Sequence, residues 1–401
     1  MKRQYISFAF RLLSCFVIAG SIGESPASAA DAYLPASDDE VLETLPSTLL
    51  SSRSELSSLR RKLADNPRDV NTAASVASLY MQMGSQEGDP RYFGYAQAAL
   101  EPWWEVNNPP AAILRLRAKL KEKDHQYDRA LDDLKTFLEH EPQDIQAWIE
   151  VSNIYRVQGK YDKSQQACDR LGEFAGDVVA NVGLVPLLIS TGQAEKADKL
   201  LADMLPIIKR ESPETLEWVL TEQAEAARAL GRDEQAERHY KEGLANNPAN
   251  LYLLRACADF LLDQNRTAEV LPLLEEHTTD NGVLLLAAIA ARRTGKKKVS
   301  RDFQTQLENR FEEIRLRGSE PHGRFESRCA LELQDDAQKA LTLALDNWEK
   351  QKEMNDTRNV LAAAIAANDP QAAQPVVRFL KQNGNQDVDL QELVEQLEEM
   401  E

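Results

Sequence analysis

Apolar positions along most of the chain recur at the three- and four-residue spacing of an amphipathic helix. Residues 148–155 show the pattern, with Trp148, Val151, Ser152 and Tyr155 on one face. No useful length of sequence alternates with the period of two that is typical of a strand. Leu and Ala dominate while Val, Ile and Thr are sparse, and this composition favours helix. The pattern therefore predicts an all-α protein.

Recurring turn signals separate these helical stretches. A Pro is followed seventeen residues later by Gly or Asn in three places: Pro67 and Gly84, Pro142 and Gly159, Pro248 and Asn265. Gly or Asn lets the chain reverse at a helix end, and Pro fits where a helix has already ended. The helix after the turn carries a small residue at a fixed offset, as at Ala130, Ala197 and Ala236. The signals predict antiparallel helix pairs in close contact.

The predicted turns fall at a nearly constant interval. They lie at His125, Gly159, Gly192, Gly231, Asn265 and Gly295, with separations of 34, 33, 39, 34 and 30 residues. A period near 34 residues is that of tetratricopeptide repeats. Residues 148–161 resemble the first helix and turn of that repeat, and residues 114–142 and 220–248 fit it in the same register. The resemblance implies a right-handed superhelical solenoid of antiparallel helix pairs, with about 7–9 hairpins.

The resemblance is good over residues 66–310 and weaker to about 384, which suggests a division of the chain. We expect a signal peptide (1–30), an extended acidic segment (31–52), the repeat solenoid (53–310), a degenerate helical continuation (311–384) and an amphipathic C-terminal capping helix (385–401). Pro186 predicts a kink in one helix. Helical hairpins are expected over 324–352 and 357–383. The last helix would give the open end of the solenoid a polar outer face.

The first thirty residues have the pattern of a secretory signal. Lys2, Arg3 and Arg11 precede an apolar run over 12–22, and small residues follow at 27–30, so cleavage is expected after Ala29 or Ala30. A lipoprotein that is acylated at Cys15 is the alternative, although residues 16–18 stay apolar. No later segment is long enough to span a bilayer. We expect an exported protein, located in the periplasm.

Charge and motif content argue against several classes of function. The formal net charge of −18 argues against nucleic acid as a ligand. We find no catalytic, cofactor or metal motif, and the five His are scattered. Adjacent acidic pairs such as Asp132 and Asp133 diverge by about 100° on a helix, and we interpret them as solvated. The chain is therefore predicted to be neither an enzyme nor a cofactor protein.

Three cysteines remain after the predicted signal, namely Cys168, Cys257 and Cys329. They are far apart, whereas an exported protein held by disulfides usually has more cysteines at closer spacing. We interpret them as small core residues, with one bridge and an odd thiol as the alternative.

Residues 89–104 are too long and too aromatic for a standard turn. They resemble a segment found in a group of exported bacterial proteins of this repeat type whose role is unassigned. Clustered Trp and Tyr are typical of binding hot spots. We prefer the interpretation that these aromatics wedge an irregular first hairpin against the second.

A partner site follows from the resemblance, because such solenoids bind through the concave surface lined by the first helix of each repeat. The thirty positions that match this surface hold eight basic and four acidic residues, although the whole chain is acidic. The hypothesis is a protein or peptide partner that bears carboxylates and is held by Arg side chains. The residues chosen for this groove are Arg115, Lys119, Asn153, Arg156, Trp218, Arg228, Tyr252, Arg255 and Arg292.

The sequence thus predicts a non-catalytic exported scaffold or adaptor that binds a partner in its groove. The alternative is a structural or assembly component of a cell-envelope complex that associates with itself through its ends.

Overall fold

The computed structural model describes residues 47–211, 215–316, 318 and 320–400. The predicted signal peptide and residues 31–46 lie outside this range. Within it the regular structure is entirely helical, without a strand, so the all-α prediction is confirmed. None of the helices in the described part of the chain combines the length and apolar character needed to cross a bilayer.

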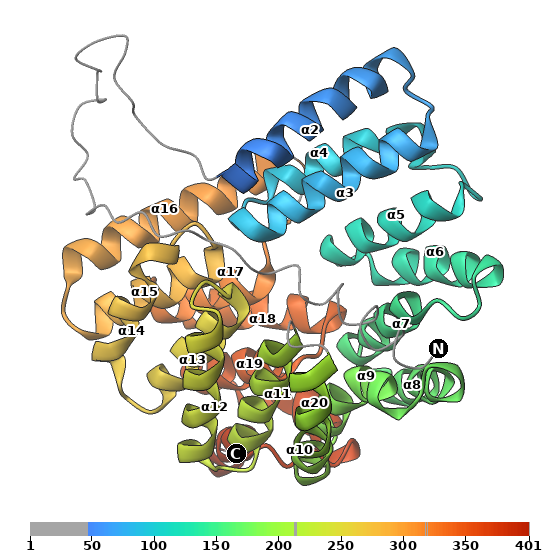
Figure 1. Ribbon diagram of the computed structural model, residues 1–401. Coiled ribbons are helices and arrows are strands. Elements are labelled where there is room, and N and C mark those ends of the chain that lie inside the picture. Colours follow the sequence, from blue (N-terminus) through green and yellow to red (C-terminus); the bar gives the residue numbers. More distant parts are fainter. Residues whose placement is uncertain (1–46, 212–214, 317, 319, 401) are drawn as a thin grey trace, which may run out of the picture.

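The described helices form a solenoid of nine consecutive hairpins flanked by one helix at each end. The first half comprises α2 (Ser47–Asp65), α3 (Val70–Glu87), α4 (Arg91–Ala99), α5 (Ala111–Lys123), α6 (Tyr127–His140), α7 (Ile145–Val157), α8 (Tyr161–Ala175), α9 (Asp177–Ser190) and α10 (Ala194–Glu211). The second half comprises α11 (Leu216–Ala229), α12 (Asp233–Asn246), α13 (Leu251–Asp263), α14 (Thr267–Leu274), α15 (Asn281–Arg293), α16 (Lys297–Leu316), α17 (Gly323–Glu332), α18 (Ala337–Lys350), α19 (Met354–Ala366), α20 (Pro370–Gln382) and α21 (Val388–Glu399). Figure 1 shows these hairpins side by side along the chain.

The turn residues behave as the period predicts. All six of the turns between 125 and 295 have a positive φ, from 56° at Asn265 to 76° at Gly295. Asp335 (φ 55°) and Asn368 (φ 52°) continue the series in the C-terminal region, so the repeat persists where its consensus is lost. The fifth residue after each turn is buried against the preceding helix, and in this region those residues are Ala340 and Ala373. The hairpins are therefore tetratricopeptide-like throughout.

Gly84 corrects one of the predicted turns. It lies inside α3 rather than at its end, and the helix is followed by Gly88, which has a φ of 66°. A Cβ on Gly84 would lie 3.0 Å from the Phe93 ring of α4. The glycine therefore provides room for close packing between α3 and α4.

The aromatic segment wedges the first hairpin against the second, as the sequence interpretation preferred. Phe93 and Trp103 share a core with Ile113 and Leu120 of α5. The buried Arg117 donates from Nη1 to the carbonyl oxygens of Trp103, Trp104 and Val106 at 2.7–2.8 Å. This guanidinium holds the segment that follows α4 onto α5.

Two other sequence interpretations have clear outcomes. The three cysteines are free and buried, as expected of core residues. Asp133 is buried rather than solvated, because its carboxylate accepts hydrogen bonds from Arg117 (2.6 and 2.8 Å) and Lys121 (2.7 Å). Asp133 lies on the face of α6 that packs on α5, which adjacency in sequence alone does not reveal.

Helix α9 runs through Pro186 without a break, and the kink expected there stays a prediction. Two other elements differ from the sequence expectations in detail. Helix α2 begins at Ser47, inside the segment expected to be extended, and packs on α3. The terminal helix α21 packs on α19 and also contacts α11, so it lies against the middle of the solenoid rather than only at its end.

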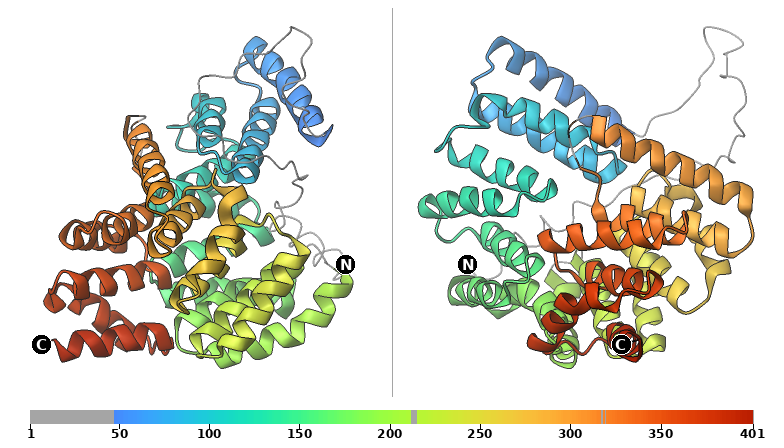
Figure 2. Two further views of the ribbon diagram at one scale, coloured as in Figure 1. Left: turned by 90° about the vertical axis from the view of Figure 1, so that its left-hand side faces the viewer. Right: turned by 180° about the vertical axis from the view of Figure 1, so that it is seen from behind.

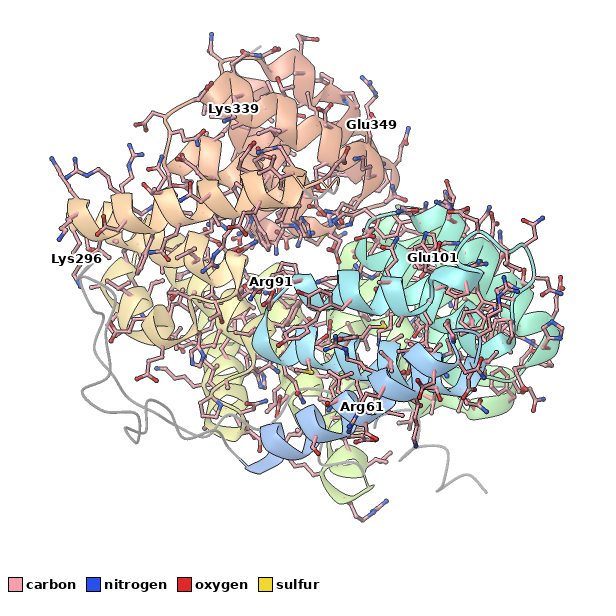
Figure 3. All side chains as sticks on the ribbon, turned by 90° about the horizontal axis from the view of Figure 1, so that it is seen from above. Arg61, Arg91, Glu101, Lys296, Lys339 and Glu349 are labelled. Atoms are coloured by element: carbon pink, nitrogen blue, oxygen red, sulfur yellow. The ribbon has the colours of Figure 1, made fainter. Side chains whose placement is uncertain are left out.

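The solenoid curves until its C-terminal hairpins return to its middle ones. The views from the side and from behind place α19–α21 beside α9–α12 (Figures 1 and 2). The first hairpin also lies close to the start of α15, because a Cβ on Gly88 would lie 3.5 Å from the backbone of Asp280. From above, Arg91 lies toward the middle of the molecule and Lys296 at its edge (Figure 3).

Candidate functional site

Residues 351–389 pack against helix ends and turns in the middle of the chain, such as those at Gly159 and Gly192. We call this contact the seam. The Lys352 amide, between α18 and α19, donates to the Val157 carbonyl at the end of α7 (2.6 Å). The Asn385 side-chain amide donates to the Ser190 carbonyl (3.2 Å). The Tyr127 hydroxyl donates to Oε1 of Gln351 (2.8 Å). These bonds join residues that are at least 195 positions apart in the sequence.

The turn glycines give the seam its close fit. A Cβ on Gly192 would lie 1.9 Å from the carbonyl oxygen of Gly384, and one on Gly159 would lie 2.9 Å from the Phe379 ring. Both glycines also have a φ of 71°, where other residues are strained. The same glycines therefore allow the hairpin to reverse and the C-terminal segment to approach.

The carboxylate of Glu353, just before α19, forms ion pairs at the seam. Glu353 accepts hydrogen bonds from Nη2 of Arg156 (3.0 Å) and Nη2 of Arg324 (2.6 Å). Burial favours a raised pKa for Glu353, but the guanidinium groups of Arg324 and Arg156 outweigh it and hold the pKa far below its usual range. Glu353 is thus an anion in the groove, supplied by the chain itself.

A second charged contact joins α21 to the middle of the solenoid. Asp389 Oδ2 accepts from Nε of Arg228 (3.1 Å) and from Nη2 of Arg358 (2.9 Å). Asp263, at the end of α13, pairs with the same two guanidinium groups. Arg228 is 7% exposed, whereas each of the two carboxylates is 35% exposed.

The five arginines of the predicted groove all pair with carboxylates of this chain. Their N–O distances are 3.5 Å for Arg115 to Asp144, 3.0 Å for Arg156 to Glu353, 3.1 Å for Arg228 to Asp389, 2.9 Å for Arg255 to Asp280 and 2.6 Å for Arg292 to Asp335. Arg156 and Arg228 lie at the seam. Arg115 and Arg255 face the interior, while Arg292 lies farther along the chain and is exposed.

The other four predicted groove residues are less uniform. Asn153 donates to Glu122 (3.1 Å) and accepts from Arg156 (2.8 Å). Lys119 is exposed, Trp218 is partly buried and Tyr252 is 52% exposed. Whether any of the nine binds a partner stays a prediction.

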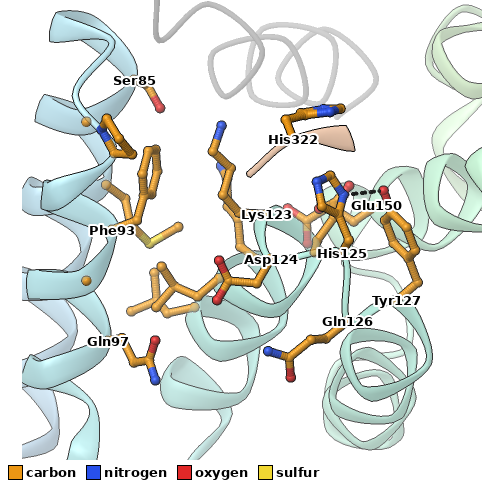
Figure 4. A pocket seen from close by; sticks show the side chains of 18 of the residues that line it. Ser85, Phe93, Gln97, Lys123, Asp124, His125, Gln126, Tyr127, Glu150 and His322 are labelled. Carbon is orange, nitrogen blue, oxygen red and sulfur yellow. Dashed lines mark hydrogen bonds between the residues drawn. The ribbon is translucent and has the colours of Figure 1, made fainter. Parts of the chain in front are cut away.

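A large hollow lies on the concave side, beyond the part that the seam occupies. Its volume is about 1850 Å³, and its walls come from α3–α5, α7, α13 and the segments around α15–α17. Ser85, Phe93 and Gln97 lie on one side in Figure 4, opposite Lys123 and His125. The N-terminal hairpins and the segments around α15–α17 therefore enclose the hollow together.

Polar side chains of α5 and α7 form one wall of the hollow, which we call the acidic floor: Glu122, Gln146, Glu150 and Asn153. Burial and the neighbouring Glu150 raise the pKa of Glu122 to about 7. Burial also raises the pKa of Glu150, although Lys119 and Arg115 oppose it. Glu150 is 8% exposed. Its Oε2, and Oε1 of Gln146, have no hydrogen-bond partner in the described structure.

Two histidines meet at the edge of the hollow. The rings of His125 and His322 are edge to face with centroids 4.8 Å apart, and His125 Nδ1 lies 2.9 Å from the Tyr127 hydroxyl (Figure 4). Burial, followed by the charge of Lys123, lowers the pKa of His125 to about 4. Both rings are therefore neutral at physiological pH and pack as aromatic groups.

The described residues contain no group of three or more side chains placed to hold a metal ion. Burial raises the pKa of the Cys257 thiol to about 11 and that of Cys329 to about 12, which is the opposite of an activated nucleophile.

The seam residues are what the sequence analysis missed. Glu353 and Asp389 were not among the chosen residues, because the C-terminal region was treated as a degenerate continuation and a cap. A signal was present: Asp335 and Asn368 are 33 residues apart, each with an Ala five residues later. That spacing indicates complete repeats in the C-terminal region.

Solved structures with similar helix arrangements include a tetratricopeptide repeat protein. The type IV pilus biogenesis factor PilW has 16% identity and a TM-score of 0.39, covering 50% of this chain and 94% of its own. A tetratricopeptide repeat protein from Parabacteroides merdae has 14% identity and a TM-score of 0.40, covering 65% and 93%. A Rap protein complexed with competence and sporulation factor has 12% and 0.49, covering 84% and 94%.

No family model matches the chain, and no curated protein matches it. With identities of 16% or less and TM-scores below 0.5, these structural likenesses say nothing of what the chain binds.

Proposed function

We propose that the protein is an exported, non-catalytic scaffold that binds a segment of another protein in its central hollow. The observation that carries this proposal is the hollow itself, which remains open although the seam occupies the neighbouring part of the concave surface. Solenoids bind through such concave surfaces. Tyr95, on α4, adds to the hollow an aromatic side chain that is 51% exposed, and aromatic residues of this kind are common at binding hot spots.

The size of the hollow favours a polypeptide over a small molecule. A small-molecule pocket usually has a volume of about 300–1,000 Å³, whereas this hollow is about 1850 Å³. Charged and polar side chains are also spread over its walls. An extended or helical segment can use several such contacts at once.

The expected position of a carboxylate-bearing partner changes, because the groove arginines are already paired. The arginines that motivated it already hold Glu353, Asp389 and other carboxylates of this chain. A partner carboxylate at Arg156 or Arg228 would have to displace one of them. We therefore place the partner in the hollow rather than along the seam.

Export rests on the pattern of residues 1–30 and is part of the proposal. We propose cleavage after Ala29 or Ala30 and a periplasmic location, followed by an acidic segment up to α2, which begins at Ser47, and a solenoid that continues to the terminal helix. The mass of the chain purified from cells that express it in full length tests the cleavage. A lipid-modified N-terminus at Cys15 would establish the lipoprotein alternative.

Photo-crosslinking in the expressing cells tests partner binding. A photoreactive amino acid replaces Lys119 or Tyr95, which both line the hollow, or the exposed Glu139 on α6 as the outer control. We expect one adduct of defined mass from the inner positions and none from Glu139. Inner positions that give no adduct, or the same adducts as Glu139, would overturn the proposal. An adduct of twice the chain mass from the inner positions would instead establish self-association.

A further inference from the structure

The acidic floor holds acceptors that the described part of the chain leaves without donors. Glu150 is 8% exposed. Its Oε1 receives one long hydrogen bond from Gln146 Nε2 (3.4 Å), while its Oε2 receives none. Oε1 of Gln146 is also without a partner. A buried carboxylate that lacks donors costs free energy, which a donor arriving from outside would recover.

The cations nearest to Glu150 are occupied or too far away to pair with it. Arg115 pairs with Asp144 (3.5 Å), and the Lys123 ammonium lies over the Phe93 ring, 4.9 Å from its centroid. Lys119 is exposed on α5 and acts on Glu150 through its charge, without an ion pair within 4 Å among the described residues. Glu122 is close enough for the charge of Glu150 to raise its pKa. The floor is therefore a site with spare acceptors and insufficient positive charge.

We propose that the acidic floor binds a Lys or Arg side chain of the protein segment that occupies the hollow. This inference rests on the proposed function and adds the chemistry of recognition. It reverses the preference expected from the basic groove positions, because their arginines are already neutralised within the chain while Glu150 is not.

Ammonium and guanidinium groups match this set of acceptors. Each carries three or five N–H donors and no acceptor, and the floor offers carboxylate and amide oxygens from two helices. Asn153 positions Glu122 by donating to it at 3.1 Å. Hydrogen bonds between charged groups are stronger than neutral ones, so a single basic side chain fixes the register of the bound segment. Lys119 competes for the same carboxylates, and removing its charge should strengthen binding.

Peptide selection tests the inference. A phage-displayed library of random peptides is panned against the chain purified from cells that express it in full length, and the selected peptides are measured by fluorescence anisotropy. We expect selected peptides to share a Lys or Arg. Replacing that residue by norleucine should weaken binding about 10- to 100-fold, whereas acetylating the peptide N-terminus should leave it unchanged.

Protein variants locate the site. Glu150→Gln should abolish the difference between the basic peptide and its norleucine form, and Lys119→Gln should enhance it. Glu139→Gln, an equal change of charge on the outside of α6, should leave it intact. Glu150→Gln removes a carboxylate that burial disfavours, so we expect it to fold.

The outcomes separate the two proposals. Peptides that bind, lose affinity when Lys119 or Gln97 in the hollow is changed to Trp, and show no basic preference would overturn the inference and leave the proposed function standing. A preference that survives Glu150→Gln would also overturn the inference. Selection of no peptide that depends on the hollow would overturn both.

Discussion

Two stretches of the same concave surface differ in whether the C-terminal hairpins cover them. Around Arg156 and Arg228, residues from the C-terminal hairpins approach and pair with the guanidinium groups. Around Lys119, Glu122 and Glu150, the surface borders an open hollow of about 1850 Å³. The sequence hypothesis placed the binding site along both stretches, because the charge of the groove positions contrasts with that of the whole chain. The structure teaches that a basic groove can be complementary to its own C-terminal segment.

The largest loss of stability is expected from Arg324, which pairs with carboxylates next to the seam. Arg324 donates to Asp356, which is fully buried, at 2.7 and 2.6 Å and to Glu353 at 2.6 Å. Arg324→Ala leaves the buried Asp356 carboxylate without its cation, and we expect a loss of about 3–5 kcal/mol in the free energy of unfolding. Urea denaturation measures it.

Arg129→Ala serves as the control for this prediction. The Arg129 pair with Glu105 is 49% and 76% exposed, so its removal should cost less than about 1 kcal/mol. Equal losses in the two variants would mean that the Arg324 network is not buried as described.

A smaller and more local effect is expected from the contact that holds α21. Asp389→Asn removes the charge shared by Arg228 and Arg358. We expect a cost of about 1.5–3 kcal/mol, less than at Arg324 because Asp389 is 35% exposed. Hydrogen exchange should accelerate in α21 and leave α5–α6 unchanged. Glu392→Gln, at an exposed position of the same helix, should change neither.

At Glu122, which lines the hollow, we expect a substitution to stabilise the folded chain rather than destabilise it. The pKa of Glu122 is about 7 in the folded chain against 4.5 ordinarily, so the folded state binds more protons between these values. Stability from this group is therefore lost as pH rises from about 4.5 to 7. Glu122→Gln should match the parent melting temperature at pH 4 and exceed it increasingly up to pH 8. A constant difference across this range would show that Glu122 is solvated.

The smallest effect is expected at Arg292, the groove arginine whose pair lies on the outer surface. Arg292 is 38% exposed and its partner Asp335 is 75% exposed. Water replaces such a pair at little cost, so Arg292→Ala should stay within about 0.5 kcal/mol of the parent. A loss comparable to that of Asp389→Asn would mean that the five arginines are equivalent after all.

Local chemistry explains why the repeat was predictable. Each hairpin needs a residue that tolerates a positive φ, a small residue at the crossing and an apolar stripe, and these signals lie within about 34 residues of one another. His125, Gly159 and Gly231 were therefore found from sequence alone. Gly84 was misassigned because a glycine that makes room for Phe93 looks the same in sequence as one that ends a helix.

The site was less predictable because its contacts are long-range. Arg156 and Glu353 are 197 residues apart, and nothing local to either residue indicates that they meet. The position of Arg156 on the concave surface followed from the repeat register, but its pairing depends on how far the whole solenoid curves. That curvature sums small rotations over many hairpins, and the sequence pattern does not specify it.

Amide hydrogen exchange at Lys352 tests the closure of the concave surface most directly. This amide lies outside the helices, and its bond to the Val157 carbonyl (2.6 Å) exists only if the C-terminal hairpins dock on the middle of the solenoid. We predict that it exchanges as slowly as the neighbouring helical amides of α19, and faster in Arg324→Ala. Exchange at the rate of an unstructured loop in the parent chain would contradict the seam.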